Sequence, residues 1–167
     1  KKNKKITPEN IPAATQLFTP NWIVKYMVEN SLGRLWMLNN RNSKLINNME
    51  FYIDPDENET NFLKISGPEE IKICDPACGS GHLLIYAYDL LYFIYEEEGY
   101  TPELIPSLIL KNNLFGIDLD KRAGDLAAFA LVMKARVNNK SFFNSSIQPN
   151  ICVLENIKFE SNELNEY

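Results

Sequence analysis

The sequence lacks the marks of several protein classes. Among its 167 residues are three cysteines, an odd count with no dense framework, so a disulfide scaffold is excluded and a reduced, cytoplasmic setting is favoured. No run reaches the roughly 18 consecutive apolar residues of a membrane-spanning helix. The basic residues 1–5 are not followed by the apolar stretch of a signal peptide. Because no methionine begins the chain, we expect a piece of a longer protein.

An excess of positive charge is missing as well. The net charge is −5 and the sequence pI is about 5.0. A domain that holds a phosphate backbone by itself is normally basic, so this segment is not expected to be the main nucleic-acid clamp. Apolar residues make up 45% of the chain, which supplies a core and excludes a disordered or collagen-like protein.

Histidine occurs once, which bears on metal binding. Cys74, Cys78 and His82 are spaced four apart and form one candidate ligand set. The glycine turn between them and the lack of an obvious fourth ligand favour the alternative, two small buried thiols.

The residues after position 70 alternate between strand-like and helix-like patterns. Gly and Pro are absent from 82–95, which is apolar on most faces and predicts a helix buried between a sheet and another layer. The order of elements predicts an α/β fold with a parallel, doubly wound sheet. The expected elements are a strand at 71–75, a turn at 76–81, helices at 82–95, 102–111 and 121–137, and strands at 113–118 and 151–154.

The residues before position 70 form a separate, mainly helical segment, 1–69, ahead of the α/β domain at 70–167. Thr19 is a good N-cap and Pro20 suits the first helical position, so we expect a helix from there to about Leu38. The stretch 39–70 is read as a connection with one short helix around 43–51.

Acidic residues follow two of the predicted strands. Asp75 opens the glycine-containing turn DPACGSG, and Asp118 ends the next strand. The turn is not the GxGxxG pattern of dinucleotide sites, and Asp118 lies far beyond the roughly 20-residue gap of that pattern. A carboxylate at the turn repels a pyrophosphate but suits an ammonium group, and an acid after the second strand can bind both ribose hydroxyls. S-adenosylmethionine (SAM) fits these demands better than NAD.

Local roles are the alternative for these side chains. Asp75 could cap the turn, and Asp118 with Asp120 could cap the helix that begins near Lys121. The cofactor interpretation is favoured because the acids occur in order at the ends of consecutive strands. His82 is read as a residue of the first helical turn rather than a catalytic base, and the aromatic residues of 86–95 as core.

Three motifs in order resemble those of N6-adenine DNA methyltransferases in which SAM binding precedes catalysis. DPACGSG is similar to their SAM-binding motif, and LFTP at 17–20 to the upstream motif that holds the methionine end of SAM. ATQLFTPNWIVKYMVENSLGRLW, DPACGSGHLLIYAYDLLYFIYEEEGY and NNLFGIDLDKRA resemble, more narrowly, the large adenine-specific methyltransferase of BREX phage-defence systems, and then fused restriction-modification enzymes.

The resemblance covers most of 11–160 and implies a Rossmann-like class I SAM-dependent methyltransferase fold with a partial parallel sheet and an N-terminal helical segment. It implies methyl transfer from SAM to adenine N6 in DNA, for host protection in phage defence or restriction-modification. The chain departs from the family pattern at position 155, where it has Glu and the relatives more commonly have Asp. The implied cofactor residues are Phe18 and Thr19 at the methionine carboxylate, Asp75 and Ala77 along the methionine moiety, Gly79 and Gly81 in the loop, Asp118 at the ribose, Leu119 on the adenine, Glu155 at the adenine amino group and Asn156 at a ring nitrogen.

The catalytic motif of that family, Asn or Asp followed by Pro-Pro and an aromatic residue, does not occur in this sequence. It grips the flipped adenine, so we expect the SAM-binding half of a methyltransferase domain, inactive alone, with DNA and any defence-system partners bound through other parts of the parent. The first strand should then be a sheet edge, inviting self-association or cover by 39–70. A methyltransferase of RNA, protein or small molecules and a non-catalytic SAM-binding module are the alternatives, and no metal is expected.

Overall fold

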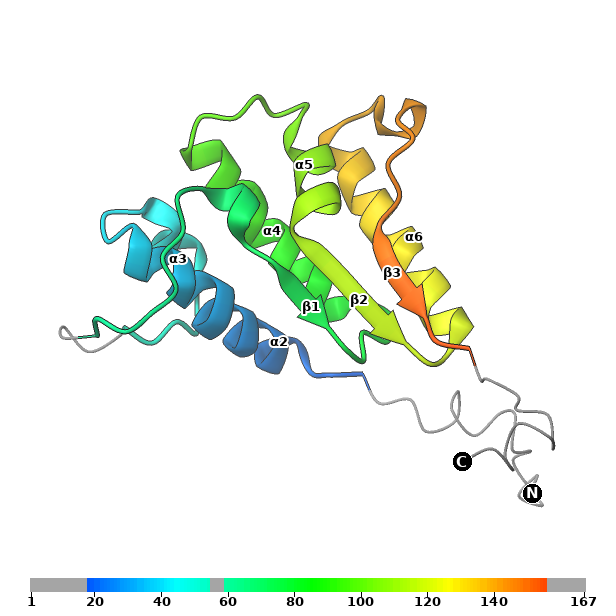
Figure 1. The fold of residues 1–167 in the computed structure, drawn as a ribbon, viewed down its shortest axis with the longest axis horizontal. Helices are drawn as coiled ribbons and strands as arrows, with labels where there is room; N and C mark the ends of the chain where they lie inside the picture. Colours follow the sequence, from blue (N-terminus) through cyan, green and yellow to red (C-terminus); the bar gives the residue numbers. More distant parts are fainter. Residues whose placement is uncertain (1–17, 55–58, 156–167) are drawn as a thin grey trace, which may run out of the picture.

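The computed structural model describes residues 18–54 and 59–155 (Figure 1). Its first element is one continuous helix made of α2 (Asn21–Val28), a π-helical turn (Glu29–Gly33) and α3 (Arg34–Asn39). The expected start was wrong by one position, because Pro20 has an extended ψ of 142° and is itself the N-cap. Its carbonyl accepts the N–H groups of Ile23 and Val24, which leaves Thr19 outside the helix.

The connection between α3 and the sheet is held by side chains of the π-helical turn. Asn30 donates to the Phe51 carbonyl and accepts the Ile53 N–H, both at 2.8 Å. Glu29 is fully buried and accepts hydrogen bonds from the Phe51 N–H and the Tyr86 hydroxyl. The short helix expected around 43–51 is a 3-10 helix, Lys44–Asn48, and a second one spans Pro68–Glu70.

The sheet has three parallel strands in the order β1-β2-β3, as expected. They are β1 (Ile73–Asp75), β2 (Leu114–Asp118) and β3 (Asn150–Val153). Ile73 lies opposite Leu114, and Gly116 lies opposite Ile151. Within the described residues β1 pairs only with β2, so it lies at an edge of the sheet.

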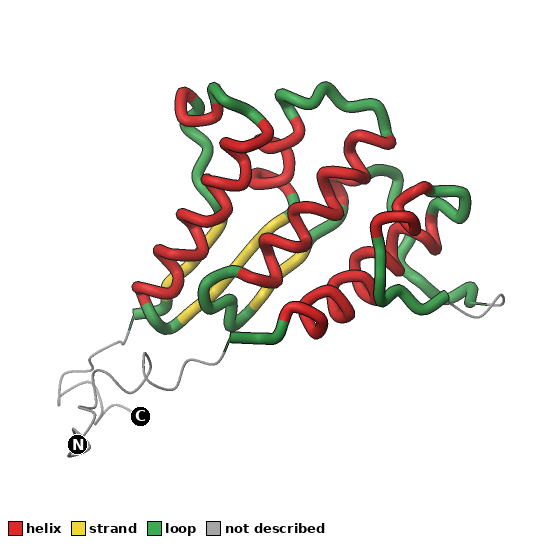
Figure 2. The backbone as a smooth tube through the Cα atoms, turned by 180° about the vertical axis from the view of Figure 1, so that it is seen from behind, coloured by secondary structure: helices red, strands yellow, loops and turns green. Residues whose placement is uncertain are grey.

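Three further helices confirm the alternating pattern: α4 (His82–Glu97), α5 (Ile105–Asn112) and α6 (Lys121–Asn138). A 3-10 turn, Phe142–Asn144, leads to β3. Seen from behind, the helices lie in front of the strands, on one face of the sheet (Figure 2). The expected doubly wound arrangement is therefore not seen in the described residues. The strand order runs in a single direction, and right-handed crossovers that never reverse direction place every helix on the same face.

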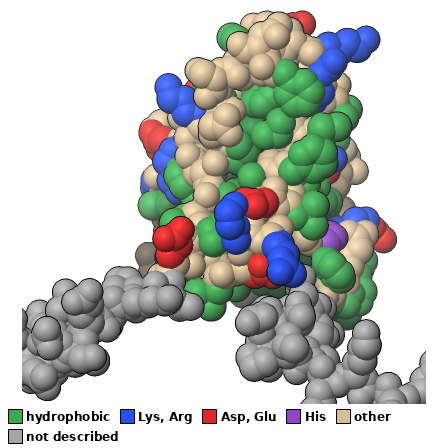
Figure 3. Space-filling model, turned by 90° about the vertical axis from the view of Figure 1, so that its right-hand side faces the viewer, with side chains coloured by type: hydrophobic (Ala, Val, Ile, Leu, Met, Phe, Trp, Pro, Cys, Tyr) green, Lys and Arg blue, Asp and Glu red, His purple; other side chains and the backbone are tan. Residues whose placement is uncertain are grey.

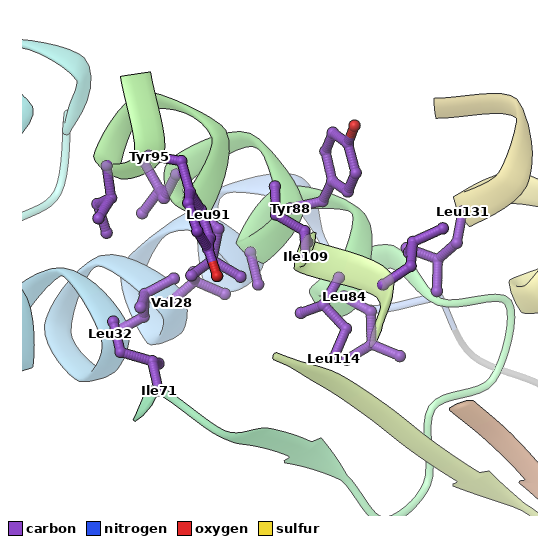
Figure 4. Close-up of a cluster of buried hydrophobic side chains, with 14 of the residues drawn as sticks. Val28, Leu32, Ile71, Leu84, Tyr88, Leu91, Tyr95, Ile109, Leu114 and Leu131 are labelled. Carbon is purple, nitrogen blue, oxygen red and sulfur yellow. The ribbon is translucent and has the colours of Figure 1, made fainter. Parts of the chain in front are cut away.

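Helix α4 is the centre of the core, as its apolar composition predicted. It packs against α2, α5, α6 and the strands, and Figure 4 shows its side chains meeting those of all these layers. Full burial of each large apolar side chain contributes about 1.5–3 kcal/mol. The expectation that the aromatic residues of this helix belong to the core is confirmed for Tyr88 and Tyr95, which are fully buried, but not for Phe93, which is exposed. The buried residues of α4 are Leu84, Ala87, Tyr88, Leu90, Leu91, Ile94 and Tyr95.

Candidate cofactor site

The turn between β1 and α4 is shaped by glycines that no other residue could replace without strain. Gly79 and Gly81 have φ angles of 54° and 83°, in the left-handed region that favours glycine. Gly81 is also the N-cap of α4, and a Cβ there would lie 3.0 Å from the Cβ of Ala127 in α6. The turn thus brings its backbone N–H groups to the carboxyl end of the sheet, where α4 and α6 come close together.

A partly open cavity of about 120 Å³ lies between this turn and the start of α2. It lies between the LFTP and DPACGSG motifs, which are far apart in the sequence. Of the expected site residues, five line it: Phe18, Thr19, Asp75, Ala77 and Gly79. Gly81 does not line it and acts through the geometry of the turn.

Asp75 caps the glycine turn, which was the alternative to a role in cofactor binding. Its Oδ1 accepts the Ala77 N–H at 3.1 Å, which caps the turn. The carboxylate is half-buried and borders the cavity. Its Oδ2 accepts no hydrogen bond from the part of the chain that the structure describes, so one oxygen remains for a ligand.

Asp118 connects the end of β2 to the glycine turn. Its Oδ2 accepts the Gly79 N–H at 2.7 Å, and its Oδ1 accepts the Asp120 N–H at 2.8 Å. The Cys78 N–H also donates to the Ile117 carbonyl at 2.9 Å. A carboxylate offers about four lone-pair positions, so two remain for further donors. The capping role belongs to Asp120, the N-cap of α6, whose side chain accepts the Arg122 N–H.

The remaining expected residues lie at the same end of the sheet or outside the described residues. Leu119 follows Asp118 and is 78% exposed. The Leu154 N–H donates to the Asp118 carbonyl at 2.9 Å, which brings the exposed Glu155 to the same sheet end. Asn156 lies outside the described residues, so its expected contact has no structural account here.

Several residues that line the cavity were not assigned to the site from the sequence. Their positions inside or next to the LFTP and DPACGSG motifs could have suggested them. Which of them face the cavity, however, depends on the path of the turn. His82 is indeed in the first turn of α4, and it also borders the cavity. The set is Val24, Cys78, Ser80, His82 and Leu83.

The cysteines do not form a shared site. Cys78 is buried on the helix side of the sheet, where a Cβ at Gly116 would lie 3.1 Å from its Sγ. Cys74 is exposed and belongs to the opposite face with Phe115. In residues 18–54 and 59–155 no group of three or more His, Cys, Asp or Glu side chains could hold a metal ion. Over the same ranges no helix is long and apolar enough to cross a membrane.

Comparison with known proteins assigns the chain to a family. Residues 54–156 match the family described as MmeI, DNA-methyltransferase domain. The chain belongs to this family. The matched MmeI-type methyltransferase domain contains the glycine turn, Asp118 and Glu155, but begins after the Phe18–Thr19 segment.

Curated relatives confirm the resemblance to adenine-specific DNA methyltransferases. The adenine-specific methyltransferase BrxX of Escherichia coli O9:H4 (strain HS) is 46% identical over 96% of this chain and 14% of its own length. The adenine-specific methyltransferase PglX of Lacticaseibacillus casei (strain Zhang) is 44% identical over 90% of the chain and 14% of its own length. The chain therefore spans about one seventh of these relatives.

A solved structure shares the fold of this methyltransferase-family chain. The ATP-dependent Type ISP restriction-modification enzyme LlaBIII, solved bound to DNA, matches with a TM-score of 0.50 and 13% sequence identity. The match covers 90% of this chain and 9% of that protein. At this identity the likeness concerns the α/β arrangement alone.

Proposed function

We propose that this chain binds SAM and forms the cofactor-binding part of an adenine-specific DNA methyltransferase. The observation that carries the proposal is the cavity that joins Phe18 and Thr19 to the DPACGSG turn, with Asp118 bonded to that turn. The names of the relatives, adenine-specific methyltransferases, support the reaction class and its target base.

The size of the cavity fits one end of SAM. Pockets that enclose a whole drug-sized ligand measure roughly 300–1,000 Å³, whereas this one measures about 120 Å³. The methionine end therefore belongs inside, where the free Oδ2 of Asp75 suits its ammonium group and Thr19 its carboxylate. The adenosine part belongs along the open edge that Asp118, Leu119 and Glu155 form. When bound, SAM supplies an electrophilic methyl group on its sulfonium.

Each residue of the chain has a distinct task in this arrangement. Asp118 binds the ribose hydroxyls with the lone pairs that Gly79 and Asp120 leave free. Leu119, now largely exposed, packs on the adenine ring and loses water contact on binding. Glu155 accepts a hydrogen bond from the adenine amino group, and the backbone of Asn156, the next residue, contacts a ring nitrogen.

The proposal extends to the organisation of the parent protein. Residues 1–69 are the helical segment that carries LFTP, and 70–167 are the first half of a class I SAM-dependent methyltransferase fold. Adenine is gripped by the Pro-Pro motif and DNA is bound by parts outside this chain, as a net charge of −5 supports. The parent acts in the cytoplasm in phage defence or restriction-modification, and the three free cysteines suit that reduced compartment.

Calorimetric titration with SAM, S-adenosylhomocysteine and NAD in parallel tests the proposal. We expect the first two to bind and NAD not to bind. In Asp118→Asn the amide keeps one oxygen for the Gly79 N–H but loses the charge, and SAM binding should weaken by about 1–3 kcal/mol. Glu103→Gln, which removes an exposed charge beside α5, is the matched control and should bind as wild type. Equal SAM affinity in all three proteins would remove Asp118 from the site, and binding of NAD alone would favour an oxidoreductase.

Methyl transfer by the chain alone is expected to be absent. The residues that hold a flipped adenine are not in this sequence, so tritium from labelled SAM should not enter duplex DNA above a control without protein. Incorporation into adenine would contradict this. Incorporation into RNA, protein or a small molecule instead would support the alternative methyltransferase classes, and SAM binding without any transfer by the whole parent would indicate a non-catalytic module.

A further inference from the structure

An aromatic contact links the two halves of the cavity. The ring of Phe18, ahead of α2, meets the His82 imidazole, at the start of α4, edge to face, with 5.4 Å between centroids and an angle of 74°. Both rings border the cavity. Phe18 is 61% exposed, so few other contacts restrain it. This contact attaches the segment that carries Thr19 to the first turn of α4.

The imidazole is itself held in place by the turn. His82 Nδ1 lies 3.0 Å from the hydroxyl of Ser80, within hydrogen-bond distance. Ser80 is buried, and Gly81 between the two residues has the left-handed backbone that starts α4. The orientation of the ring thus follows from the geometry of the turn.

We propose that His82 is a positioning residue of the cofactor site, which holds Phe18 and Thr19 over the methionine end of the cofactor. This rests on the proposed SAM site. His82 acts through the ring of Phe18 and not on the reacting atoms. Without it, the segment before α2 is free to move away from the turn, and cofactor binding must order it again at an entropic cost.

A purely structural role would give a different result. The His82 side chain is exposed, so its removal should change the folding stability little. A positioning role changes SAM affinity and local order while the unfolding midpoint stays fixed. Substitution by Phe keeps an aromatic edge against Phe18 but not the bond to Ser80, whereas Gln keeps a polar group and loses the ring.

Titration of SAM against wild type, His82→Ala, His82→Phe and His82→Gln tests the proposal, with Lys111→Ala as an exposed control far from the cavity. Because the Ala and Gln variants lose the edge-to-face contact with Phe18, their affinity for SAM should fall by about 2- to 10-fold. The Phe variant should restore most of it. In the double variant Phe18→Ala/His82→Ala the loss should be no greater than in Phe18→Ala alone.

Hydrogen exchange of residues 18–24 in the absence of cofactor keeps this proposal separate from the proposed function. We expect faster exchange in His82→Ala than in wild type, with the rest of α4 unchanged. If wild type binds no SAM, the proposed function fails, and the exchange data still decide the positioning role. Unchanged exchange in 18–24, or losses that multiply in the double variant, would overturn it.

Discussion

Asp118 accepts backbone N–H groups from two segments while it remains at the edge of a cavity. The Gly79 N–H and the Asp120 N–H each occupy one of its oxygens. This makes its replacement by Ala a poor probe of ligand binding, because two donors would lose their partner at the same time. An amide at this position removes the charge and can keep the acceptor for the Gly79 N–H, although the Asp120 N–H then loses its partner, so Asp118→Asn disturbs the turn less than Asp118→Ala.

Cys78 lies beside this network and should be chemically inert. Burial first, and then the charges of Asp118 and Asp75, raises the pKa of its thiol from 9.0 to about 11. At about pH 8 the thiolate fraction is then about 100-fold lower than for an ordinary thiol. Alkylation with iodoacetamide, followed by mass spectrometry, should modify the exposed Cys74 and Cys152 well before Cys78.

The same raised pKa has a consequence for stability. The neutral thiol is favoured in the folded state, so its contribution is complete below about pH 9 and is lost as the pH rises through about 11. The unfolding midpoint of wild type should fall over that range more steeply than that of Cys78→Ala. Equal alkylation rates for Cys78 and Cys152 would contradict this account of the buried thiol.

At the scale of single residues, the sequence was enough to predict that the acids and glycines lie together at one end of the sheet. Asp75 and Asp118 could be predicted because carboxyl ends of parallel strands meet at one edge. The contact between His82 and Phe18 and the proximity of Ser80 to His82 could not, since they depend on the left-handed backbone at Gly81 and on the path of the chain before α2. That contact joins residues far apart in the chain and leaves no local pattern.

Helix α6 has two faces that should respond differently to substitution. Its inner face is buried at Ala127, Leu131 and Ala135, whereas large apolar residues on its outer face are exposed. Figure 3 views the molecule from the side of β3 and α6 and shows hydrophobic side chains gathered there. The exposed residues of the outer face are Leu126, Phe129, Met133 and Val137.

Leu131→Ala should destabilise the fold by about 2–5 kcal/mol, because it opens a cavity between α6 and the core. Phe129→Ser, on the outer face, should change the stability by less than about 0.5 kcal/mol. Urea unfolding of both variants checks the difference. A large loss of stability in Phe129→Ser would mean that its ring is buried in solution.

The elements themselves were largely predictable, because their apolar periodicity is strong. The strands that became β2 and β3 and the helices α4 and α6 have close to the expected bounds. Errors arose at the ends of elements. The extended Pro20 delays α2, and β1 begins at Ile73 instead of residue 71 because the Ile71 N–H donates to the Pro68 carbonyl of the preceding 3-10 helix. The π-helical turn had no sequence signal, because it depends on Glu29 and Asn30 binding the distant residues Phe51 and Ile53.

The molecule as a whole presents an edge at β1. The Ile71 and Ile73 N–H groups donate to the Pro68 and Asn113 carbonyls, so they are not free at this edge. Neighbouring residues of a strand point their N–H groups to opposite sides, so the Cys74 N–H faces the free edge. We expect self-association through this edge, or a cover provided by part of 39–70.

Light scattering over a range of concentrations, with hydrogen exchange at Cys74, checks the expectation. An increase in mean mass with concentration would support pairing, and a monomer with slow exchange at Cys74 would support a cover. A clean monomer with rapid exchange at Cys74 would rule out both.

The central claim is that SAM binds between the start of α2 and the carboxyl ends of the strands. Titration of the isotope-labelled chain with S-adenosylhomocysteine, followed by the shifts of backbone amide signals in NMR spectra, tests this most directly. The account predicts saturable shifts at Thr19, Ala77, Gly79, Leu119 and Glu155, with Lys111 and Phe142 unmoved. No saturable shift, or shifts confined to the polar hollow between Asn40 and Glu98, would contradict it.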